Sequence, residues 1–189
     1  MDGNDEQFTV KVERYSSDSS YDFAGFDCTV ESFNQFLTEG KIDKELERKI
    51  SIPYVCLAVR NGKPPKVIGY FTLASSCLER RLYPVSNNQR KKFLYNTVPT
   101  VVIGKLAVCK SVQGQGVGKK LLSHAIKTAY LSSKDVGCLA LYLKALNENA
   151  ADFYRSCGWI EIQEEPNSFV FPLKQYEELL KNQSKKVVG

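Results

Sequence analysis

A glycine-rich loop between a buried strand and a helix is the feature that most constrains this fold. Residues 101–108 are mostly apolar and half of them are β-branched, which predicts a buried strand. The loop Gln113-Gly114-Gln115-Gly116-Val117-Gly118 follows, and apolar residues then recur at helical spacing up to Ala129. Free backbone N–H groups and the positive end of a helix dipole meet there, and Lys119 or Lys120 can add charge. The sequence therefore predicts an anion-binding site.

The spacing of the loop decides between kinds of phosphate-binding motif. The triphosphate loop G-x-x-x-x-G-K-[ST] needs Gly at 113 and Ser or Thr at 120, where the chain has Gln113 and Lys120. The dinucleotide pattern G-x-G-x-x-G begins at Gly114 and Gly116, but Lys119 occupies its third glycine position. A glycine-rich turn without a ligand remains an alternative to these motifs.

The rest of the chain predicts an α/β fold with a mixed sheet. Apolar or alternating runs predict further strands at 8–14, 53–59, 67–74, 138–146 and 168–172. Helical spacing predicts helices near 33–37, where Asp27 or Thr29 can serve as the cap, and over 42–50 and 148–157. Residues 75–98 are more polar and predict a long, partly helical surface excursion, and the end from Lys181 to Gly189 is expected to be frayed.

Length and composition indicate one domain. The 189 residues are 43% hydrophobic, which suits a single well-buried core. We expect one domain over residues 1–175 and a basic C-terminal tail over residues 176–189. The acidic start, Met1 to Glu6, and the absence of an apolar run of about 20 residues argue against a signal peptide and a membrane span. The six cysteines lack the close pairs of metal sites, so we expect reduced thiols, no metal and a cytoplasmic location.

Two motifs at the correct separation resemble the GNAT N-acetyltransferases. Gln113, Gly116 and Gly118 match the family pattern Q/R-x-x-G-x-G/A, directly after the apolar strand. Downstream, Asn147 and then Ala150-Ala151-Asp152-Phe153-Tyr154-Arg155-Ser156-Cys157-Gly158-Trp159 resemble the family signature N…A…FY…GF. In order of elements the resemblance covers about residues 8–172.

The resemblance implies the GNAT fold, with a central strand that splays from its neighbour, and acetyl-coenzyme A as the donor. In this family the pantetheine lies in the opening between the strands and the loop amides hold the pyrophosphate. The donor contacts implied for this chain are Leu106, Ala107, Val108, Gln113, Gly114, Gln115, Gly116, Val117, Gly118, Lys119, Asn147 and Tyr154.

Residue chemistry suggests how such a site would act. Backbone N–H groups of Leu106 or Val108 can bind the thioester carbonyl, and Tyr154 is the candidate general acid because a phenol has a pKa of about 10. An aromatic packing role for Tyr154 is the alternative. No carboxylate lies between Thr100 and Lys110, which favours an α-amine, with a pKa of about 7.7–8.0, over a lysine as acceptor. His124 can be proposed as base, but its mid-helix position favours an ordinary role on the helix face.

A narrower resemblance concerns the acceptor. The segments Gly25-Phe26-Asp27-Cys28, Phe33-Asn34-Gln35-Phe36-Leu37 and Gly69-Tyr70-Phe71-Thr72-Leu73 resemble the FDC…LNxFL…GYYTL pattern of acetyltransferase toxins of toxin-antitoxin pairs. This resemblance implies acetylation of the α-amine of aminoacyl-tRNA, inhibition of translation, an antitoxin partner and a homodimer. The basic residues that would contact tRNA are Arg80, Arg81, Arg90, Lys91, Lys92 and Lys105.

The chain departs from this toxin pattern at two positions. Lys105 stands where the group usually has Arg, and Thr29 follows Cys28 where Gly is common. Two alternatives remain open from the sequence. One is a metabolic or protein N-acetyltransferase that modifies a free amine or a peptide, and the other is a regulator that binds acetyl-coenzyme A without turnover.

Overall fold

The computed structural model describes residues 9–187, and their contacts divide into two compact units. The first unit comprises the chain up to Leu73 together with Lys105–His124, and the second comprises Ala74–Gly104 and the chain from Ala125. Both units are built from two separate segments, so the chain passes between them three times. Strand β3 (Lys66–Glu79), strand β4 (Thr97–Val108) and helix α4 (Val117–Ser132) each contribute to both units.

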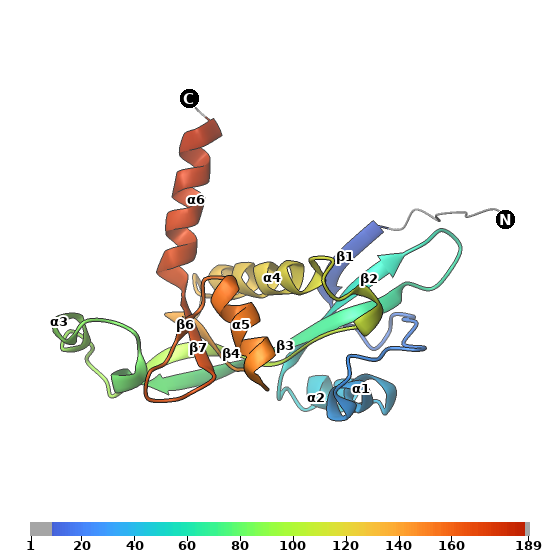
Figure 1. Cartoon of the computed structure of the whole chain (residues 1–189), viewed down its shortest axis with the longest axis horizontal. Coiled ribbons are helices and arrows are strands. Elements are labelled where there is room, and N and C mark those ends of the chain that lie inside the picture. The colour runs from blue at the N-terminus through green and yellow to red at the C-terminus, as the bar shows by residue number, and fades with distance from the viewer. Residues whose placement is uncertain (1–8, 188–189) are drawn as a thin grey trace. The chain divides into compact units, whose positions relative to one another are not determined.

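The first unit contains an antiparallel group of strands with two short helices (Figure 1). Besides its parts of β3, β4 and α4, its elements are β1 (Thr9–Arg14), α1 (Glu31–Thr38), α2 (Lys41–Glu47), β2 (Ile52–Val59) and η2 (Lys110–Val112). β1 pairs with β2 and β2 pairs with β3, both antiparallel. The turn between β2 and β3 contains Asn61-Gly62, and Gly62 has a φ of 74°, as such a turn requires.

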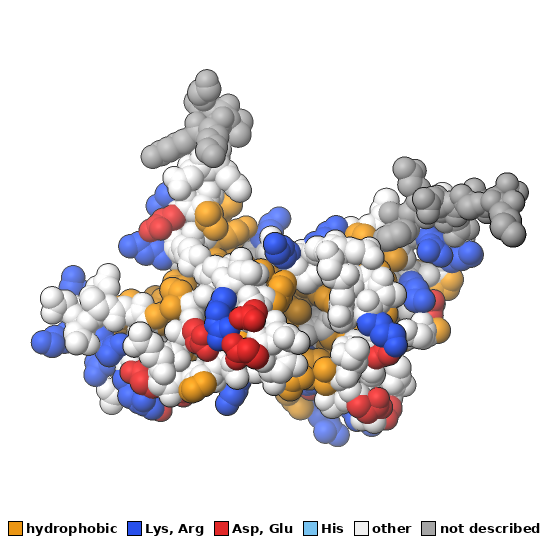
Figure 2. Space-filling model, in the orientation of Figure 1, with side chains coloured by type: hydrophobic (Ala, Val, Ile, Leu, Met, Phe, Trp, Pro, Cys, Tyr) orange, Lys and Arg blue, Asp and Glu red, His pale blue; other side chains and the backbone are white. Residues whose placement is uncertain are grey.

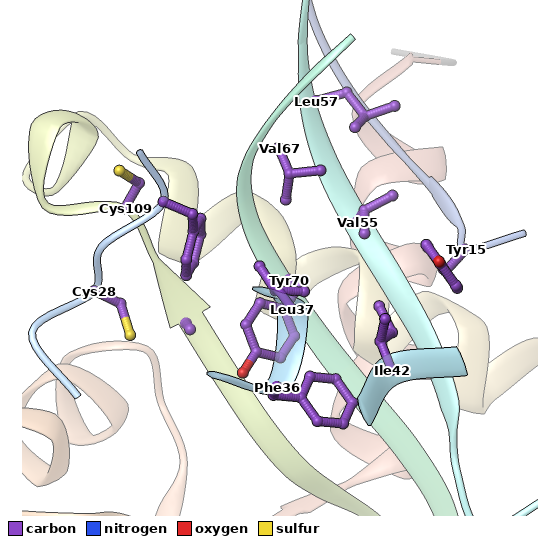
Figure 3. Packing of buried hydrophobic residues seen from close by; sticks show 12 residues of the cluster. Tyr15, Cys28, Phe36, Leu37, Ile42, Val55, Leu57, Val67, Tyr70 and Cys109 are labelled. Carbon is purple, nitrogen blue, oxygen red and sulfur yellow. The ribbon is translucent and has the colours of Figure 1, made fainter. Parts of the chain in front are cut away.

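Aromatic and aliphatic side chains together form the core of the first unit, as Figure 3 shows. Tyr70 of β3 is fully buried and stacks on Phe36 of α1, with ring centroids 5.3 Å apart. Its hydroxyl donates a hydrogen bond to the backbone oxygen of Phe33 at 2.9 Å, so this buried hydroxyl has a partner. The motif segments around residues 33–37 and 69–73 therefore meet in one hydrophobic cluster, and α1 is fixed to β3.

The second unit contains the remaining strands and helices. Besides its parts of β3, β4 and α4, its elements are η1 (Arg80–Leu82), α3 (Asn87–Arg90), β5 (Ala140–Lys144), α5 (Glu148–Ser156), β6 (Ile160–Glu161), β7 (Ser168–Pro172) and α6 (Leu173–Val187). β4 pairs with β5 in parallel, whereas β5 with β7 and β6 with β7 are antiparallel. Among the described residues the strands follow the order β1-β2-β3-β4-β5-β7-β6, which confirms the predicted mixed sheet.

The structure corrects several sequence-based predictions. The prediction of a frayed end from Lys181 is wrong for residues 181–187, which continue α6, and Tyr176 of this helix packs edge-on against Tyr130 at 5.2 Å. β3 extends five residues beyond the predicted strand, to Glu79, and the two-residue strand β6 was not predicted. Phe8, the first residue of the predicted strand 8–14, lies outside the described residues. None of the helices within 9–187 has the length and apolar character needed to cross a bilayer.

The predicted cap of the first helix is also wrong. α1 begins after Val30, and no side chain caps it. Thr29 has a φ of 71°, and the Asp27 carboxylate instead accepts hydrogen bonds from the Thr29 backbone and the Asn34 side chain. Asp27 also forms an ion pair with Lys110 at 2.7 Å, so its carboxylate fastens this loop to η2. The Lys110 ammonium and these hydrogen bonds lower the pKa of Asp27 to about 2.

Candidate active site

The glycine loop connects the end of β4 to the N-terminus of α4. Gly114 and Gly116 have φ values of 76° and 83°, so these positions need glycine for their backbone conformation. The Gln113 side chain donates to the backbone oxygen of Val108 at 3.0 Å and thereby ties the loop to the strand. Residues 113–116 are exposed. Because the first N–H groups of a helix have no intrahelical acceptor, the loop and the start of α4 suit an anion.

The two lysines after the loop have different surroundings. Both Lys119 and Lys120 are exposed, but the Lys120 ammonium donates to the backbone oxygen of Val10 at 2.6 Å. That contact attaches the first turn of α4 to β1. Lys119 is therefore better placed than Lys120 to contribute charge to an anion at the loop.

The parallel pairing of β4 with β5 is short. It covers Thr100 to Val102 opposite Ala140 to Tyr142, although both strands continue beyond these residues. Such an early end of pairing is expected for a splayed strand pair, which leaves backbone groups without a neighbouring strand. The backbone N–H of Lys105, on the continuing part of β4, donates to the Thr72 hydroxyl at 3.1 Å.

The side chain of Lys105 is committed to contacts within the first unit. Its ammonium lies 3.0 Å from the Glu45 carboxylate and 4.5 Å from the centre of the Phe36 ring. Ser51 donates to the other carboxylate oxygen of Glu45 at 2.5 Å. The side chains of Lys105 and Glu45 are only 26% and 22% exposed. These contacts give no support to the prediction that Lys105 contacts tRNA.

Glu45 is a residue that the sequence reasoning missed. The central strand has no carboxylate of its own, but α2 brings that of Glu45 to its surface. Nothing in the spacing of the charged segment 42–50 distinguishes Glu45 from its acidic neighbours. The Lys105 ammonium and the Ser51 hydroxyl contact one oxygen each of this carboxylate, so both of its oxygens have partners within the first unit.

Asn147 precedes α5 as its N-cap and Tyr154 lies in its last turn, both in the second unit. Asn147 is the N-cap of this helix, and its side-chain oxygen accepts from the Ala150 N–H at 3.0 Å. Tyr154 is only 8% exposed, and its ring lies 5.9 Å from that of Trp159 and 5.8 Å from that of Phe169. Burial raises the pKa of Tyr154 to about 12, so its hydroxyl is protonated at neutral pH. The packing role and the acid role are therefore compatible.

An ion-pair cluster, which was not predicted, holds α5. The Arg155 guanidinium contacts Glu148 and Asp152 of the same helix at 2.6 Å and Glu161 of β6 at 2.9 Å. Figure 2 shows acidic side chains around a basic one on the surface of α5. The contact with Glu161 links the helix that carries Tyr154 to the adjacent strand.

The five predicted tRNA contacts of the surface excursion, Arg80, Arg81, Arg90, Lys91 and Lys92, fall into two groups. The guanidiniums of Arg80 and Arg90 donate to the backbone oxygens of Phe93, at 2.9 Å, and Tyr83, at 3.4 Å, and so help to fold the excursion itself. Arg81, Lys91 and Lys92 are exposed, but Arg81 forms an ion pair with Glu79 at 2.7 Å. Lys91 and Lys92 are therefore the best placed to meet phosphates.

The contacts of His124 support an ordinary role on the helix face. It is half-buried on α4, with its ring 5.6 Å from that of Tyr54 and 6.2 Å from that of Phe71. These contacts account for its position without a catalytic role.

The structure thus groups the predicted donor contacts within each unit. The loop 113–118, Lys119 and residues 106–108 belong to the first unit, and Asn147 and Tyr154, the N-cap and the last turn of α5, belong to the second. A parallel strand pair that separates early, followed by a glycine loop and a helix N-terminus, defines the class of α/β proteins that bind a phosphate-containing ligand beyond the end of a strand.

Comparison with known proteins identifies the family within that class. Residues 54–161 match the family model of an acetyltransferase (GNAT) domain. The chain belongs to the GNAT family, as its two motifs predicted, and acetyl-coenzyme A is the donor that this family uses.

Solved structures and one curated protein are similar to the chain over different lengths. A mutant of KacT is 37% identical with a TM-score of 0.84, over 90% of this chain and 98% of that one. AtaT complexed with acetyl-methionyl-tRNAfMet is 38% identical with a TM-score of 0.83, over 91% of this chain and 99% of that one. A tRNA-acetylating toxin of Mycobacterium tuberculosis is 29% identical over 89 residues, which are 47% of this chain and 52% of the toxin. This match therefore spans about half the length of that curated relative.

Proposed function

We propose that this protein is an acetyl-coenzyme A-dependent N-acetyltransferase that modifies the α-amine of aminoacyl-tRNA and thereby inhibits translation. The observation that carries the proposal is similarity over about nine-tenths of the chain to AtaT, a protein solved with acetyl-methionyl-tRNAfMet. The conformation of the loop and the early end of the β4–β5 pairing agree with it, because both leave backbone N–H groups available to a donor.

The donor site is proposed to use the loop and the end of β4. The loop amides from Gln113 to Gly118, with Lys119, would bind the pyrophosphate of acetyl-coenzyme A, and backbone groups of Leu106, Ala107 and Val108 would bind its pantetheine and thioester carbonyl. Exposure of residues 113–116 and the positive φ of Gly114 and Gly116 support this assignment, because they leave the loop backbone open. Asn147 is proposed to contact the donor with the part of its amide that does not cap α5.

Tyr154 is proposed as the general acid. The amine nitrogen attacks the carbonyl carbon, the carbon–sulfur bond breaks, and the leaving thiolate takes the phenolic proton. The proton that the amine loses then restores the phenol through solvent. The raised pKa of Tyr154 keeps the hydroxyl protonated until it is used. Structures of both KacT and AtaT include mutants in which a single tyrosine is replaced by phenylalanine, which agrees with a special role for a tyrosine in these relatives.

The surroundings of the central strand favour a weakly basic acceptor. The Glu45 carboxylate, which α2 brings to this strand, is engaged through both oxygens by Lys105 and Ser51. A lysine side chain, with a pKa of about 10.4, would need a base to lose its proton, whereas an α-amine with a pKa of about 7.7–8.0 is partly neutral already. The geometry therefore suits the amine of an aminoacyl ester better than a lysine.

Protein partners and location belong to the same proposal. AtaT has been solved bound to the C-terminus of the antitoxin AtaR and acetyl-coenzyme A. By analogy, we propose that this protein is neutralised by an antitoxin, forms a homodimer and acts in the cytoplasm, where charged tRNA is used.

The direct test is transfer of label from acetyl-coenzyme A. Purified protein is incubated with labelled acetyl-coenzyme A and total charged tRNA, and label is measured on RNA, protein and small amines. We expect label on charged tRNA but not on deacylated tRNA, because only the former carries the α-amine. Label on protein or small amines alone would support the metabolic or protein acetyltransferase instead. Binding of acetyl-coenzyme A without any transfer would support the regulator.

A further inference from the structure

Two neighbouring apolar side chains project from the surface excursion between α3 and β4. Leu94 is 90% exposed and Tyr95 is 74% exposed, which makes them the two most exposed large hydrophobic residues among those described. Contiguous exposed apolar surface, unlike single scattered residues, marks sites of interaction. The packing of the chain does not account for this pair, so we refer to residues 94–95 as the apolar tip.

The apolar tip has a fixed base. Arg80 donates from its guanidinium to the backbone oxygen of Phe93 at 2.9 Å and from its backbone N–H to that of Asn96 at 2.8 Å. One residue therefore holds the backbone on both sides of the tip. The Phe93 ring packs edge-on against Tyr83, with centroids 5.7 Å apart. Leu94 and Tyr95 project from an anchored turn, which lowers the entropic cost of binding a ligand.

The charge beside the tip is positive. Lys91 and Lys92 precede it by two to four residues and are exposed, and Figure 2 shows Lys and Arg side chains around the segment that contains α3. Arg81 contributes less, because it is paired with Glu79. A basic surface next to an exposed aromatic ring is the combination that binds single-stranded nucleic acid: lysines contact phosphates and the ring stacks on a base.

We propose that the Tyr95 ring, flanked by Leu94, stacks on an unpaired base of the RNA substrate while Lys91 and Lys92 contact its phosphates. The proposal rests on the proposed function for RNA as the partner. An unpaired base is required because bases inside an A-form helix stack on one another and their faces are covered. The unpaired 3′ end of tRNA and its loops both offer such bases.

Binding of RNA by Tyr95 variants tests the proposal. The probes are a deacylated tRNA transcript and the same transcript without its unpaired 3′ nucleotides, and the dissociation constant is measured at several salt concentrations. Tyr95→Ser is expected to weaken binding of the full transcript about ten-fold, the size of one base–aromatic stacking contact. Tyr95→Phe keeps the ring and should bind like the wild type. The salt dependence should be the same for all, because no phosphate contact is removed.

Val136→Ser is the matched control, since Val136 is also highly exposed in the second unit, at 72%, but belongs to the segment between α4 and β5 and not to the surface excursion. An effect of Tyr95→Ser that disappears with the shortened transcript assigns the base to the 3′ end, and an effect that persists assigns it to a loop. Equal affinity of Tyr95→Ser and wild type would overturn the proposal. So would a change of oligomeric state in Tyr95→Ser at unchanged affinity, since it would mean that the tip contacts a second copy.

The outcome is separable from that of the proposed function. If the wild-type protein acetylates charged tRNA but Tyr95→Ser binds normally, only the stacking contact is wrong. If the wild type binds RNA through Tyr95 but transfers no acetyl group to it, the stacking contact stands and the proposed reaction is wrong. Failure of the wild type to bind either transcript would contradict both the stacking contact and the proposed action on tRNA.

Discussion

At the scale of single residues, the hydroxyl of Tyr154 carries the sharpest prediction. Tyr154→Phe is expected to lower kcat by about 10²–10⁴-fold, the usual effect of losing a general acid, while the dissociation constant of acetyl-coenzyme A is unchanged. The variant keeps the ring that packs against Trp159 and Phe169, so the melting temperature should not fall. Steady-state kinetics with charged tRNA and calorimetric titration of the donor measure the two quantities.

Tyr142→Phe is the control for that substitution. Tyr142 is a half-buried tyrosine of β5 whose hydroxyl lies 3.4 Å from that of Ser168, and it has no proposed part in the chemistry. Loss of the Tyr142 hydroxyl should leave kcat unchanged. If Tyr154→Phe also retained full kcat, Tyr154 would be a packing residue and the thiolate would take its proton from elsewhere.

The sequence assigns candidate roles to residues where a motif fixes them and gives little guidance where distant contacts decide. The positions of Gln113, Gly116 and Tyr154 followed from two motifs. Arg80 and Arg90 looked equivalent to the neighbouring lysines as basic residues, but the structure turns them toward backbone oxygens of their own loop. Local sequence does not indicate which arginine finds a carbonyl oxygen seven or thirteen residues away.

At the scale of elements, the close approach of β3 and β4 depends on Gly69. A Cβ at this position would lie 3.0 Å from the backbone oxygen of Ala107 and 3.0 Å from the Leu121 side chain. Backbone cannot yield as a flexible side chain does, so Gly69→Ala should separate the strands and lower the free energy of unfolding by about 1–3 kcal/mol. Denaturant unfolding measures this change.

Gly137→Ala serves as the comparison, because a Cβ at Gly137 would meet nothing within 4 Å. That variant should unfold at the same denaturant concentration as the wild type. Equal stability of both variants would mean that β3 and β4 adjust to the extra methyl group without cost, and Gly69 would then have no packing role.

Elements with strong periodicity were predictable, and short or weakly periodic ones were not. The hairpin of β2 and β3, the central strand and α4 follow from apolar runs of sufficient length. β6 has only two residues, too few for a pattern, and it forms because β7 supplies its partner. α6 carries many charged residues and few apolar ones, so its helical character depends on tertiary contacts such as that between Tyr176 and Tyr130.

At the scale of the whole molecule, the net charge of +5 leads to a prediction about salt. RNA binding should weaken as salt rises, because lysine–phosphate contacts release counterions. The variant with both Lys91→Ala and Lys92→Ala should reduce the slope of log K against log salt by about 2, one for each lost contact. Binding measured from low to physiological salt gives the slope.

Lys127→Ala is a suitable control for the salt experiment, because Lys127 is exposed on α4 and has no proposed contact with RNA. Its slope should equal that of the wild type. A wild-type slope near zero would contradict a phosphate-binding surface altogether.

The division into two units could not have been predicted from linear order. Each unit combines two segments of the chain, and β3, β4 and α4 belong to both. Composition and length indicated one domain over residues 1–175, and this extent stays a prediction. Helix α6 crosses the predicted boundary, because it begins before residue 175 and continues past it. Which segments contact each other depends on packing between residues far apart in sequence.

The position of Arg80 affects how genetic data on this protein should be interpreted. Replacement of Arg80 would remove its guanidinium contact with Phe93 and keep its backbone bond to Asn96, so it would loosen one side of residues 94–95 without removing any group that touches a ligand. A mutational scan scored by cell survival would therefore rank Arg80 with the direct contacts. Comparison of Arg80→Ala with Lys91→Ala at different salt concentrations would separate an indirect structural effect from the loss of a charge.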